Sequence, residues 1–387
     1  MADILFKPLV KSIEYTRKDG RLVAYVGTAE RCNASVAPDS GATVLSNLNE
    51  PFDFRMHIFS LDAEKIEAAG GFEATFERRR KDRPSECFAE GEYFKSERIA
   101  FSTVSVLDPG ESRRRSDRGL VFEEDLVKRE RDGFSYKLSM WRTPAGSPVR
   151  TYVMKADPRR YGILCGTPHM KPVFTPGDIQ KVMEEAEDAI AAGYDVVGAT
   201  NADFFDMFGD CHPSGLCVTR GQLVANGNTP NPFFGALKDG TPIIGTLEGY
   251  PLNAVEEAVG CGQIIVKDGE IADTAAFRPF GEVSHPRTAF GIDREGRILA
   301  MVVDGRRPAW SNGASLVELA KLMIAEGAEI AVNTDGGGSS TFIVEDRGLK
   351  MLNHPADLVR PDEDLIRPLF DSLIIYRKNT KQGSDIK

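Results

Sequence analysis

The sequence lacks an excess of positive charge, because its 58 Asp and Glu residues outnumber its 48 Lys and Arg residues and its formal net charge is -10. Nucleic acids and anionic membranes attract proteins through basic surfaces. Two basic runs, at 77–83 and 112–118, are diluted by acids and lack interleaved aromatics, which favours solvated loops. We therefore expect no nucleic-acid partner and no membrane partner, and a sugar or another small molecule fits better.

Long hydrophobic runs are missing as well. No segment approaches the roughly 20 apolar residues that a helix needs to span a bilayer. The N-terminal segment also lacks the basic stretch, apolar stretch and small-residue cleavage site of a signal peptide. We expect a soluble, cytoplasmic chain as written, or an exported one if a leader has been trimmed from it.

Cysteine is too scarce for a disulfide framework, since six cysteines are scattered along 387 residues. Cys211 and Cys217 are the closest pair and have His212 between them, but no second pair of ligands completes a zinc pattern. The acids Asp304 and Asp335 also lack the spacing of a calcium loop. The sequence therefore predicts mostly free thiols, no metal and no cofactor.

Two regions differ in their pattern of apolar residues. Residues 1–147 alternate apolar and polar positions in short runs, which predicts a strand-rich N-terminal domain whose role no motif defines. The turn residues at 143–148 mark a boundary. Residues 148–377 form a second domain, and 378–387 read as a disordered tail.

The second domain mixes helices with strands. Thr175 as N-cap and Pro176 at the first helical position predict a helix over 176–192, and a capping box from Ser315 to Glu318 predicts another over 315–326. Short apolar strands lie between and after them. We therefore predict an α+β fold, with a mixed, mostly antiparallel sheet flanked by helices.

One loop has an unusual composition, the segment "IAVNTDGGGSSTF" at 330–342. An apolar strand ends there in polar residues, and consecutive glycines leave backbone N–H groups accessible as an anion-binding nest. The phosphate-loop pattern needs a lysine that is absent, and the dinucleotide pattern does not occur. The loop predicts a binding site for phosphate or sugar.

Residues 286–342 resemble the core of the phosphodiester glycosidase family, and the resemblance extends over roughly 150–377. "ATNADFFD" is similar to the family's Asn-Gly-Gly-Phe-Phe segment, with Ala202 and Asp203 in place of the two glycines. The closing element at 353–370 also agrees, except that Ala356 replaces a serine. The matching motif residues are Arg287-Thr288, Asp304-Gly305, Ser311 with Gly313, and Asn333 through Ser339.

The resemblance implies an enzyme that hydrolyses a sugar-1-phosphodiester, such as one of N-acetylglucosamine, to a free sugar and a phosphomonoester. A phosphomonoester leaves easily once its charge is held, so a cation and a nest can replace a strong general acid. The alternative is a non-catalytic protein that binds a glycan or phosphoglycan in polysaccharide metabolism. Neither the sugar, the group beyond the phosphate nor the oligomeric state follows from the sequence.

Three residues are the catalytic candidates: Asp335, Asp304 and Arg287. The two aspartates end apolar strands and can stabilise an oxocarbenium-like transition state or activate water. Arg287 matches the family's arginine, and its planar guanidinium can hold two phosphate oxygens. The predicted substrate-binding residues are Asn201, Asp203, His212, Thr288, Asn333, Gly336, Gly337, Gly338, Ser339 and Arg367.

Overall fold

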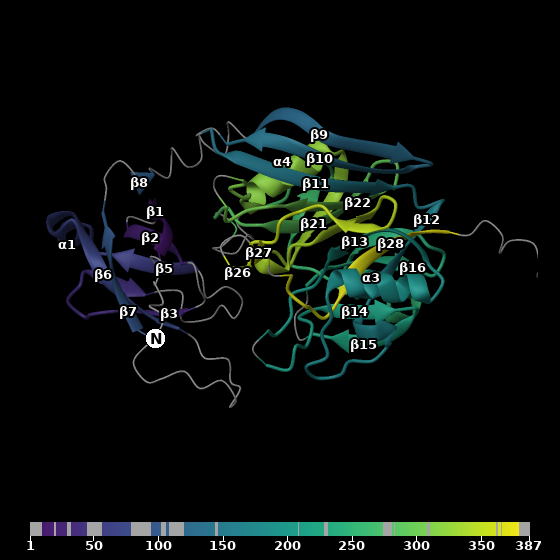
Figure 1. Ribbon diagram of the computed structural model, residues 1–387, viewed down its shortest axis with the longest axis horizontal. Coiled ribbons are helices and arrows are strands. Elements are labelled where there is room, and N and C mark those ends of the chain that lie inside the picture. Colours follow the sequence, from purple (N-terminus) through teal and green to yellow (C-terminus); the bar gives the residue numbers. More distant parts are fainter. Residues whose placement is uncertain are drawn as a thin grey trace, which may run out of the picture. The chain divides into compact units, whose positions relative to one another are not determined.

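The computed structural model describes residues 10–18, 21–28, 32–44, 56–78, 94–101, 106–107, 120–143, 146–207, 209–227, 231–273, 281, 283–307, 310–360, 363–364 and 366–378. The chain divides into two units, Met1–Asp117 and Arg118–Lys387, which are described separately below (Figure 1). No helix in the described residues is long and apolar enough to cross a membrane. The predicted disordered tail lies outside the described residues, apart from Lys378.

The described residues of unit 1 form two small sheets and one short helix. Its five-stranded sheet has the order β4-β5-β2-β1-β8, and its three-stranded sheet has the order β3-β6-β7. Apolar residues such as Phe59 and Phe72 form a core of its own. Asp62 caps the helix, and Gly70 ends it in a left-handed conformation. The elements are β1 (Val10–Lys18), β2 (Arg21–Thr28), β3 (Cys32–Val36), β4 (Ala42–Val44), β5 (Met56–Leu61), α1 (Ala63–Ala69), β6 (Gly71–Arg78), β7 (Phe94–Ala100) and β8 (Val106–Leu107).

Unit 2 is built around an eight-stranded sheet of order β20-β19-β23-β21-β22-β11-β10-β9. The strands of this sheet are β9 (Val121–Arg131), β10 (Phe134–Arg142), β11 (Pro148–Ala156), β19 (Ile264–Lys267), β20 (Glu270–Ile271), β21 (Arg287–Asp293), β22 (Ile298–Val303) and β23 (Ala328–Thr334). Every pairing that the structure describes within this sheet is antiparallel.

Two five-stranded antiparallel sheets complete unit 2, together with a two-stranded one. The first has the order β12-β28-β13-β24-β25, with β12 (Tyr161–Gly166), β13 (Asp195–Asn201), β24 (Phe342–Glu345), β25 (Leu349–Met351) and β28 (Ser372–Arg377). The second has the order β15-β14-β18-β16-β17, with β14 (Leu216–Thr219), β15 (Gln222–Asn226), β16 (Phe233–Leu237), β17 (Pro242–Gly245) and β18 (Val255–Gly260). The remaining elements are η2 (Pro168–Met170), α3 (Val182–Ala191), η3 (Leu252–Ala254), α4 (Leu316–Ala325), η6 (Gly337–Ser339), β26 (Leu358–Arg360) and β27 (Glu363–Asp364).

The central strands of the large sheet are buried on both faces, whereas its edge strand β9 is mostly exposed. Helix α4 covers one face, where its Leu319 and Met323 join a cluster with Met301 of β22. On the other face, Phe290 of β21 and Phe342 of β24 belong to the cluster that joins the large sheet to the smaller sheets. Burial of both faces explains the uninterrupted apolar runs of the central strands. The predicted α+β class, with mostly antiparallel sheets and a strand-rich N-terminal unit, is confirmed.

The start of one of the two predicted helices agrees with the structure, and the start of the other does not. Helix α4 begins after Ser315, whose capping box with Glu318 forms as predicted. Helix α3 begins only at Val182, six residues later than the prediction for its start at 176. The reason is Gly177, which has a φ of 75° and donates its N–H to Asp210 O at 2.7 Å, so this segment turns before the helix begins.

The predicted domain boundary at 147 is wrong, because the unit boundary follows Asp117. Strands β9 and β10 belong to the large sheet, where β10 pairs with β11 over its whole length. The turn residues at 143–148 connect this β10–β11 hairpin, in which Thr143 N donates to Ser147 O at 2.9 Å. A hairpin and a domain linker use the same turn residues, and only strand pairing distinguishes them.

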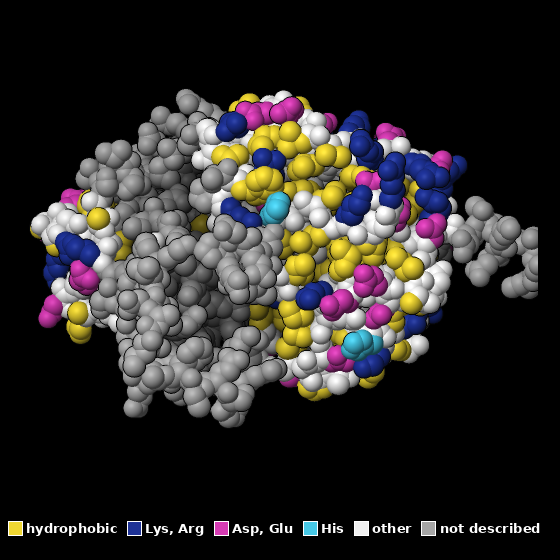
Figure 2. Space-filling model, in the orientation of Figure 1, with side chains coloured by type: hydrophobic (Ala, Val, Ile, Leu, Met, Phe, Trp, Pro, Cys, Tyr) yellow, Lys and Arg dark blue, Asp and Glu magenta, His cyan; other side chains and the backbone are white. Residues whose placement is uncertain are grey.

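Figure 2 shows one face, on which Lys and Arg side chains gather near the end of the large sheet beside β12, with Asp and Glu among them. In the neighbouring turns Arg131 and Arg160 contact Asp132, and Arg159 contacts Asp157.

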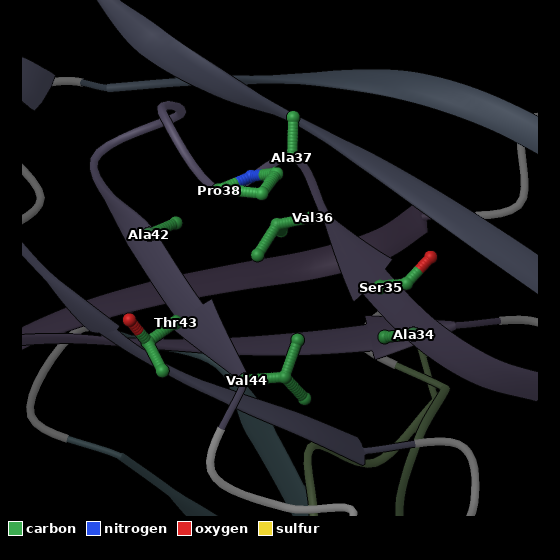
Figure 3. A pocket seen from close by; sticks show the side chains of 8 residues that line it. All are labelled: Ala34, Ser35, Val36, Ala37, Pro38, Ala42, Thr43 and Val44. Atoms are coloured by element: carbon green, nitrogen blue, oxygen red, sulfur yellow. The ribbon is translucent and has the colours of Figure 1, made fainter.

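Unit 1 has a hollow of about 350 Å³ between β3 and β4 (Figure 3). Its lining contains only small apolar and hydroxyl side chains, namely Ala34, Ser35, Val36, Ala37, Pro38, Ala42, Thr43 and Val44.

Candidate functional site

The glycine bend, residues 336–340, directly follows the strand β23 and Asp335, and each of its three glycines is required by its surroundings. A Cβ on Gly336 would lie 2.5 Å from the carbonyl oxygen of Pro286, and one on Gly338 would lie 2.2 Å from Arg367 Nη2. Gly337 has a φ of 64°, in the left-handed region that favours glycine. Close packing and backbone conformation therefore explain the three consecutive glycines.

The backbone amides of the bend do not form the predicted anion-binding nest. Gly336 N donates to Asp335 Oδ1 at 2.8 Å, and Gly337 N donates to Pro286 O at 3.0 Å. The amides of the two serines that follow donate to the carbonyls of Gly336 and Gly337, which closes a short 3₁₀ turn. Four of the five N–H groups of the bend are therefore used within the protein, which leaves side chains as the main source of positive charge at the bend.

Two guanidinium groups supply that charge. A Cβ on Gly337 would lie 3.0 Å from Arg306 Nη1, so the Arg306 guanidinium lies directly against the bend. Arg367 donates from Nη1 to Ser339 Oγ at 3.0 Å and from Nη2 to Asp357 Oδ2 at 2.5 Å. Arg367 was predicted to bind substrate, whereas Arg306 and Asp357 were missed. The position of Arg306, immediately after the Asp-Gly pair that ends β22, was the available signal.

Arg306 shows two signs of a special environment. Its φ of 59° is unusual for a side chain of this size, and such strained conformations concentrate at functional sites. Burial lowers the pKa of Arg306 to about 10, an effect that the charges of Asp357 and Asp335 oppose. The guanidinium therefore stays protonated at neutral pH. Its Nε also donates to Nδ1 of His285 at 3.4 Å.

Arg287 does not present its guanidinium to the bend as predicted. Its backbone adjoins the bend, since a Cβ on Gly336 would lie 3.4 Å from Arg287 Cα. The guanidinium instead donates from Nε to Ala314 O at 2.9 Å and from Nη2 to Val283 O at 2.8 Å. Burial lowers its pKa to about 10. Arg287 therefore holds two loops together, and Arg306 and Arg367 stand where Arg287 was expected.

Asp304, the second predicted catalytic aspartate, accepts hydrogen bonds from several residues of the protein itself. It is buried, and it accepts hydrogen bonds from Tyr152 Oη and Trp310 Nε1, each at 2.9 Å. It also accepts from Asn353 Nδ2 at 3.2 Å and from His354 N at 3.1 Å. Burial raises its pKa, and these hydrogen bonds act against that shift. Its acceptor capacity is used to fix the segment at 353–354 against the end of β22.

Asp335 is the carboxylate that lies at the bend. Its backbone N–H donates to Ala202 O at 3.1 Å, and its carbonyl accepts from Asn201 Nδ2 at 2.7 Å, so the ends of β23 and β13 are joined. The side chain is half-buried, and its charge acts on Arg306. Of the two predicted catalytic aspartates, Asp335 is the one whose charge acts on Arg306.

Three of the predicted substrate-binding residues, Asn201, Thr288 and Asn333, form hydrogen bonds within the protein. Asn201 Oδ1 accepts from Thr288 Oγ1 at 2.9 Å and from Thr341 N at 3.1 Å. Asn333 Oδ1 accepts from Gln263 N at 2.8 Å. These side chains connect strand ends and position the bend.

Asp203 and Asp371 form a buried carboxylate pair behind Asp335. Asp203 Oδ2 accepts from Gly215 N at 2.6 Å, and Asp203 N donates to Asp371 Oδ1 at 2.8 Å. Burial raises the pKa of Asp371 to about 7 and that of Asp203 well above its usual value. Asp203 was predicted to bind substrate, but it is buried. Asp371 was missed because it lies in no motif.

His212 belongs to a different part of unit 2. Its ring lies edge-on to Phe174 at a centroid distance of 4.7 Å, and its Nδ1 lies 2.7 Å from Pro213 O. None of the described contacts of its side chain reaches the glycine bend.

Comparison with known proteins gives consistent results. Residues 194–375 match the phosphodiester glycosidase family. The chain is 30% identical over 223 residues to mouse N-acetylglucosamine-1-phosphodiester alpha-N-acetylglucosaminidase, covering 52% of this chain and 40% of the mouse protein. It is 27% identical over 200 residues to the human protein of that name, covering 47% of this chain and 38% of the human protein. The chain thus spans less than half the length of these relatives.

Two solved structures have a similar fold. The catalytic domain of the zebrafish N-acetylglucosamine-1-phosphodiester alpha-N-acetylglucosaminidase, auto-inhibited by its pro-peptide, aligns with a TM-score of 0.51 and 23% identity, covering 67% of this chain and 89% of that one. A hypothetical protein from Synechocystis aligns with a TM-score of 0.50 and 11% identity, covering 95% and 80%. The matched segment 194–375 contains the glycine bend, and the sequence comparisons support the resemblance of this part of the chain to the phosphodiester glycosidase family.

Proposed function

We propose that this protein is a glycosidase that hydrolyses the glycosidic bond of sugar-1-phosphodiesters and releases a free sugar and a phosphomonoester. The observation that carries the proposal is the presence of two guanidinium groups, Arg306 and Arg367, on the same bend as the carboxylate Asp335. The match of residues 194–375 to the phosphodiester glycosidase family supports it.

The two arginines suit the phosphate of such a substrate. A guanidinium can donate two parallel hydrogen bonds to phosphate oxygens, and two guanidiniums can hold the charge that grows on the leaving phosphate. Because the second pKa of a phosphomonoester is about 6, this group leaves without a strong general acid. Arg367 is oriented by Asp357 and Ser339, so little side-chain entropy remains to be lost on binding.

Asp335 suits the sugar side of the same bond. Cleavage of a glycosidic bond develops positive charge on the sugar ring, which a nearby carboxylate stabilises, or the carboxylate activates the attacking water. Asp335 is half-buried and its backbone is fixed to Ala202 and Asn201, so its position is set before substrate binds. For the sugar we propose N-acetylglucosamine, by analogy with the mouse and human relatives.

The test measures hydrolysis of methyl N-acetylglucosamine-1-phosphate by the wild-type chain and by Asp335→Asn. Loss of the carboxylate charge is expected to lower kcat by about 100-fold or more, with the fold retained. Asp346→Asn is the matched control, because Asp346 lies in the β24–β25 hairpin and pairs with Lys350. If the folded wild-type chain binds the ester but does not hydrolyse it, this proposal is wrong, and the protein is better described as a non-catalytic glycan-binding protein.

A further inference from the structure

Three potential metal ligands meet in the interior of unit 2, outside the glycine bend. Cys165 lies on β12, Cys217 lies on β14, and Asp371 lies immediately before β28. The two Sγ atoms are 3.4 Å apart, and one ligand atom from each of the three residues lies within 4.8 Å of the others. All three side chains are at most 1% exposed. Three chain segments that are distant in sequence thus bring two thiols and a carboxylate together.

One of the two carboxylate oxygens of Asp371 lacks a hydrogen-bond partner among the described residues. Asp371 Oδ1 accepts from Asp203 N at 2.8 Å, but Asp371 Oδ2 is buried and has no hydrogen-bond partner in the described part of the chain. Among the described residues, neither Asp371 nor Asp203 forms an ion pair with a Lys or Arg side chain. A buried carboxylate without a counter-charge is costly, so the cluster is suited to a bound cation.

We propose that Cys165, Cys217 and Asp371 bind a Zn²⁺ ion that stabilises the fold of unit 2. Zinc binds thiolate and carboxylate ligands in tetrahedral geometry. With Zn–S distances of about 2.3 Å, two thiolates at a tetrahedral zinc lie about 3.8 Å apart, which is close to the present separation of the sulfurs. A disulfide would require the sulfurs to approach to about 2.05 Å. On binding, both thiols release their protons to solvent, and a water molecule or the second carboxylate oxygen takes the fourth position.

The residues around the cluster suit an outer coordination shell. Glu257 Oε2 accepts from Cys165 N at 2.9 Å and its Oε1 accepts from Arg220 N at 2.9 Å, which fixes the backbone that carries the first thiol. Asp203 N fixes one oxygen of Asp371, as outer-shell donors commonly do for metal-binding carboxylates. The sequence pairs Cys217 with Cys211, but in the fold Cys165 is the neighbour of Cys217.

The experiment loads the full chain, purified under reducing conditions and freed of metal, with Zn²⁺ or with Co²⁺. We expect one Zn²⁺ per chain to remain after gel filtration, and the melting temperature to rise by roughly 5 °C or more. The Co²⁺ form should show intense sulfur-to-cobalt charge-transfer absorption. Cys217→Ser and Asp371→Asn should lose the bound metal, whereas the control Cys211→Ser should keep it.

The wild-type protein alone is sufficient to overturn the proposal, so a variant that fails to fold does not leave it untested. A folded wild-type chain, judged by circular dichroism, that retains no Zn²⁺ and gives no charge-transfer absorption with Co²⁺ would exclude the site. So would a Cys165–Cys217 disulfide found by mass spectrometry of peptides from unreduced protein. Each measurement is independent of glycosidase activity, so failure here leaves the proposed function unaffected.

Discussion

The strands β22 and β23 lie on either side of β21 in the large sheet, and each is followed by an aspartate. The two aspartates look equivalent in the sequence but have different surroundings. Asp304, after β22, is 1% exposed and its carboxylate accepts hydrogen bonds from four residues. Asp335, after β23, is half-buried and lies beside Arg306. The comparison teaches that the hydrogen bonds around a carboxylate, rather than its place at a strand end, distinguish a structural acid from one available to substrate.

The largest expected effect comes from Asp304→Ala. The change removes an acceptor shared by four donors, two of which, on Tyr152 and Asn353, are buried, and we expect the free energy of unfolding to fall by about 3 kcal/mol or more. Asp335→Ala should lower it by less than about 1 kcal/mol, because that side chain is half-buried. Urea unfolding followed by circular dichroism measures both. Equal losses in the two variants would contradict the distinction between the two strand ends.

The second-largest effect is expected from a change of Arg306, the arginine on which the charge of Asp335 acts. Arg306→Lys keeps the charge but removes the planar pair of donors, so we expect kcat/KM for the sugar-1-phosphodiester to fall by about 100-fold. Arg294→Lys is the control, since Arg294 is exposed and pairs with Glu329. Steady-state kinetics of the folded variants gives the result. An Arg306→Lys enzyme of wild-type activity would show that the bend does not hold the phosphate through this arginine.

A smaller effect is expected from the residue that links the Asp304 end to the bend. Asn353 donates from Nδ2 to Ser340 O at 2.9 Å and to Asp304 Oδ1 at 3.2 Å. Asn353→Ala should lower the free energy of unfolding by about 2 kcal/mol. Because the two residues share a hydrogen bond, its effect should be non-additive with Asp304→Ala by about 1 kcal/mol in a double-mutant cycle. Strict additivity would show that the Asp304 end and the bend are independent.

The smallest effect is expected from Ser339→Ala. This change removes the hydroxyl that accepts from Arg367 Nη1, while the ion pair with Asp357 remains. We expect kcat/KM to fall roughly five-fold, which corresponds to about 1 kcal/mol. The matched control is Ser340→Ala, since the buried Ser340 Oγ makes no hydrogen bond to the described residues. A larger effect in the control than in Ser339→Ala would mean that the bend orients substrate by another route.

Local sequence signals predicted the parts of the fold that local contacts decide. The capping box of α4 forms between residues three positions apart, so the start of this helix was predicted correctly. The start of α3 was not, because Gly177 bonds to Asp210, a residue distant in sequence. The hairpin at 143–148 was taken for a domain boundary for the same reason, since only its partner strand identifies a hairpin.

In the candidate site, too, the sequence predicted the features that local motifs carry and missed those that depend on contacts distant in sequence. The sequence identified the glycine bend, Asp335 and Arg367, because they lie in motifs that a known family shares. It missed Arg306 and Asp371, and it assigned Arg287 to the substrate although its guanidinium bonds to backbone carbonyls. Which guanidinium faces a bend depends on carbonyl groups that other segments bring to it, and these do not appear in a motif.

The sequence by itself determined the resemblance to a known family, the α+β class and the location of the bend, since motifs, strand patterns, caps and a run of glycines are local properties of the chain. Only the tertiary structure decided which aspartate is saturated with hydrogen bonds, which arginines face the bend and which cysteine neighbours Cys217. These features depend on contacts between residues up to 152 positions apart, as between Tyr152 and Asp304. Burial and hydrogen bonding at that range arise from strand pairing and packing, which set the chemistry available to each side chain.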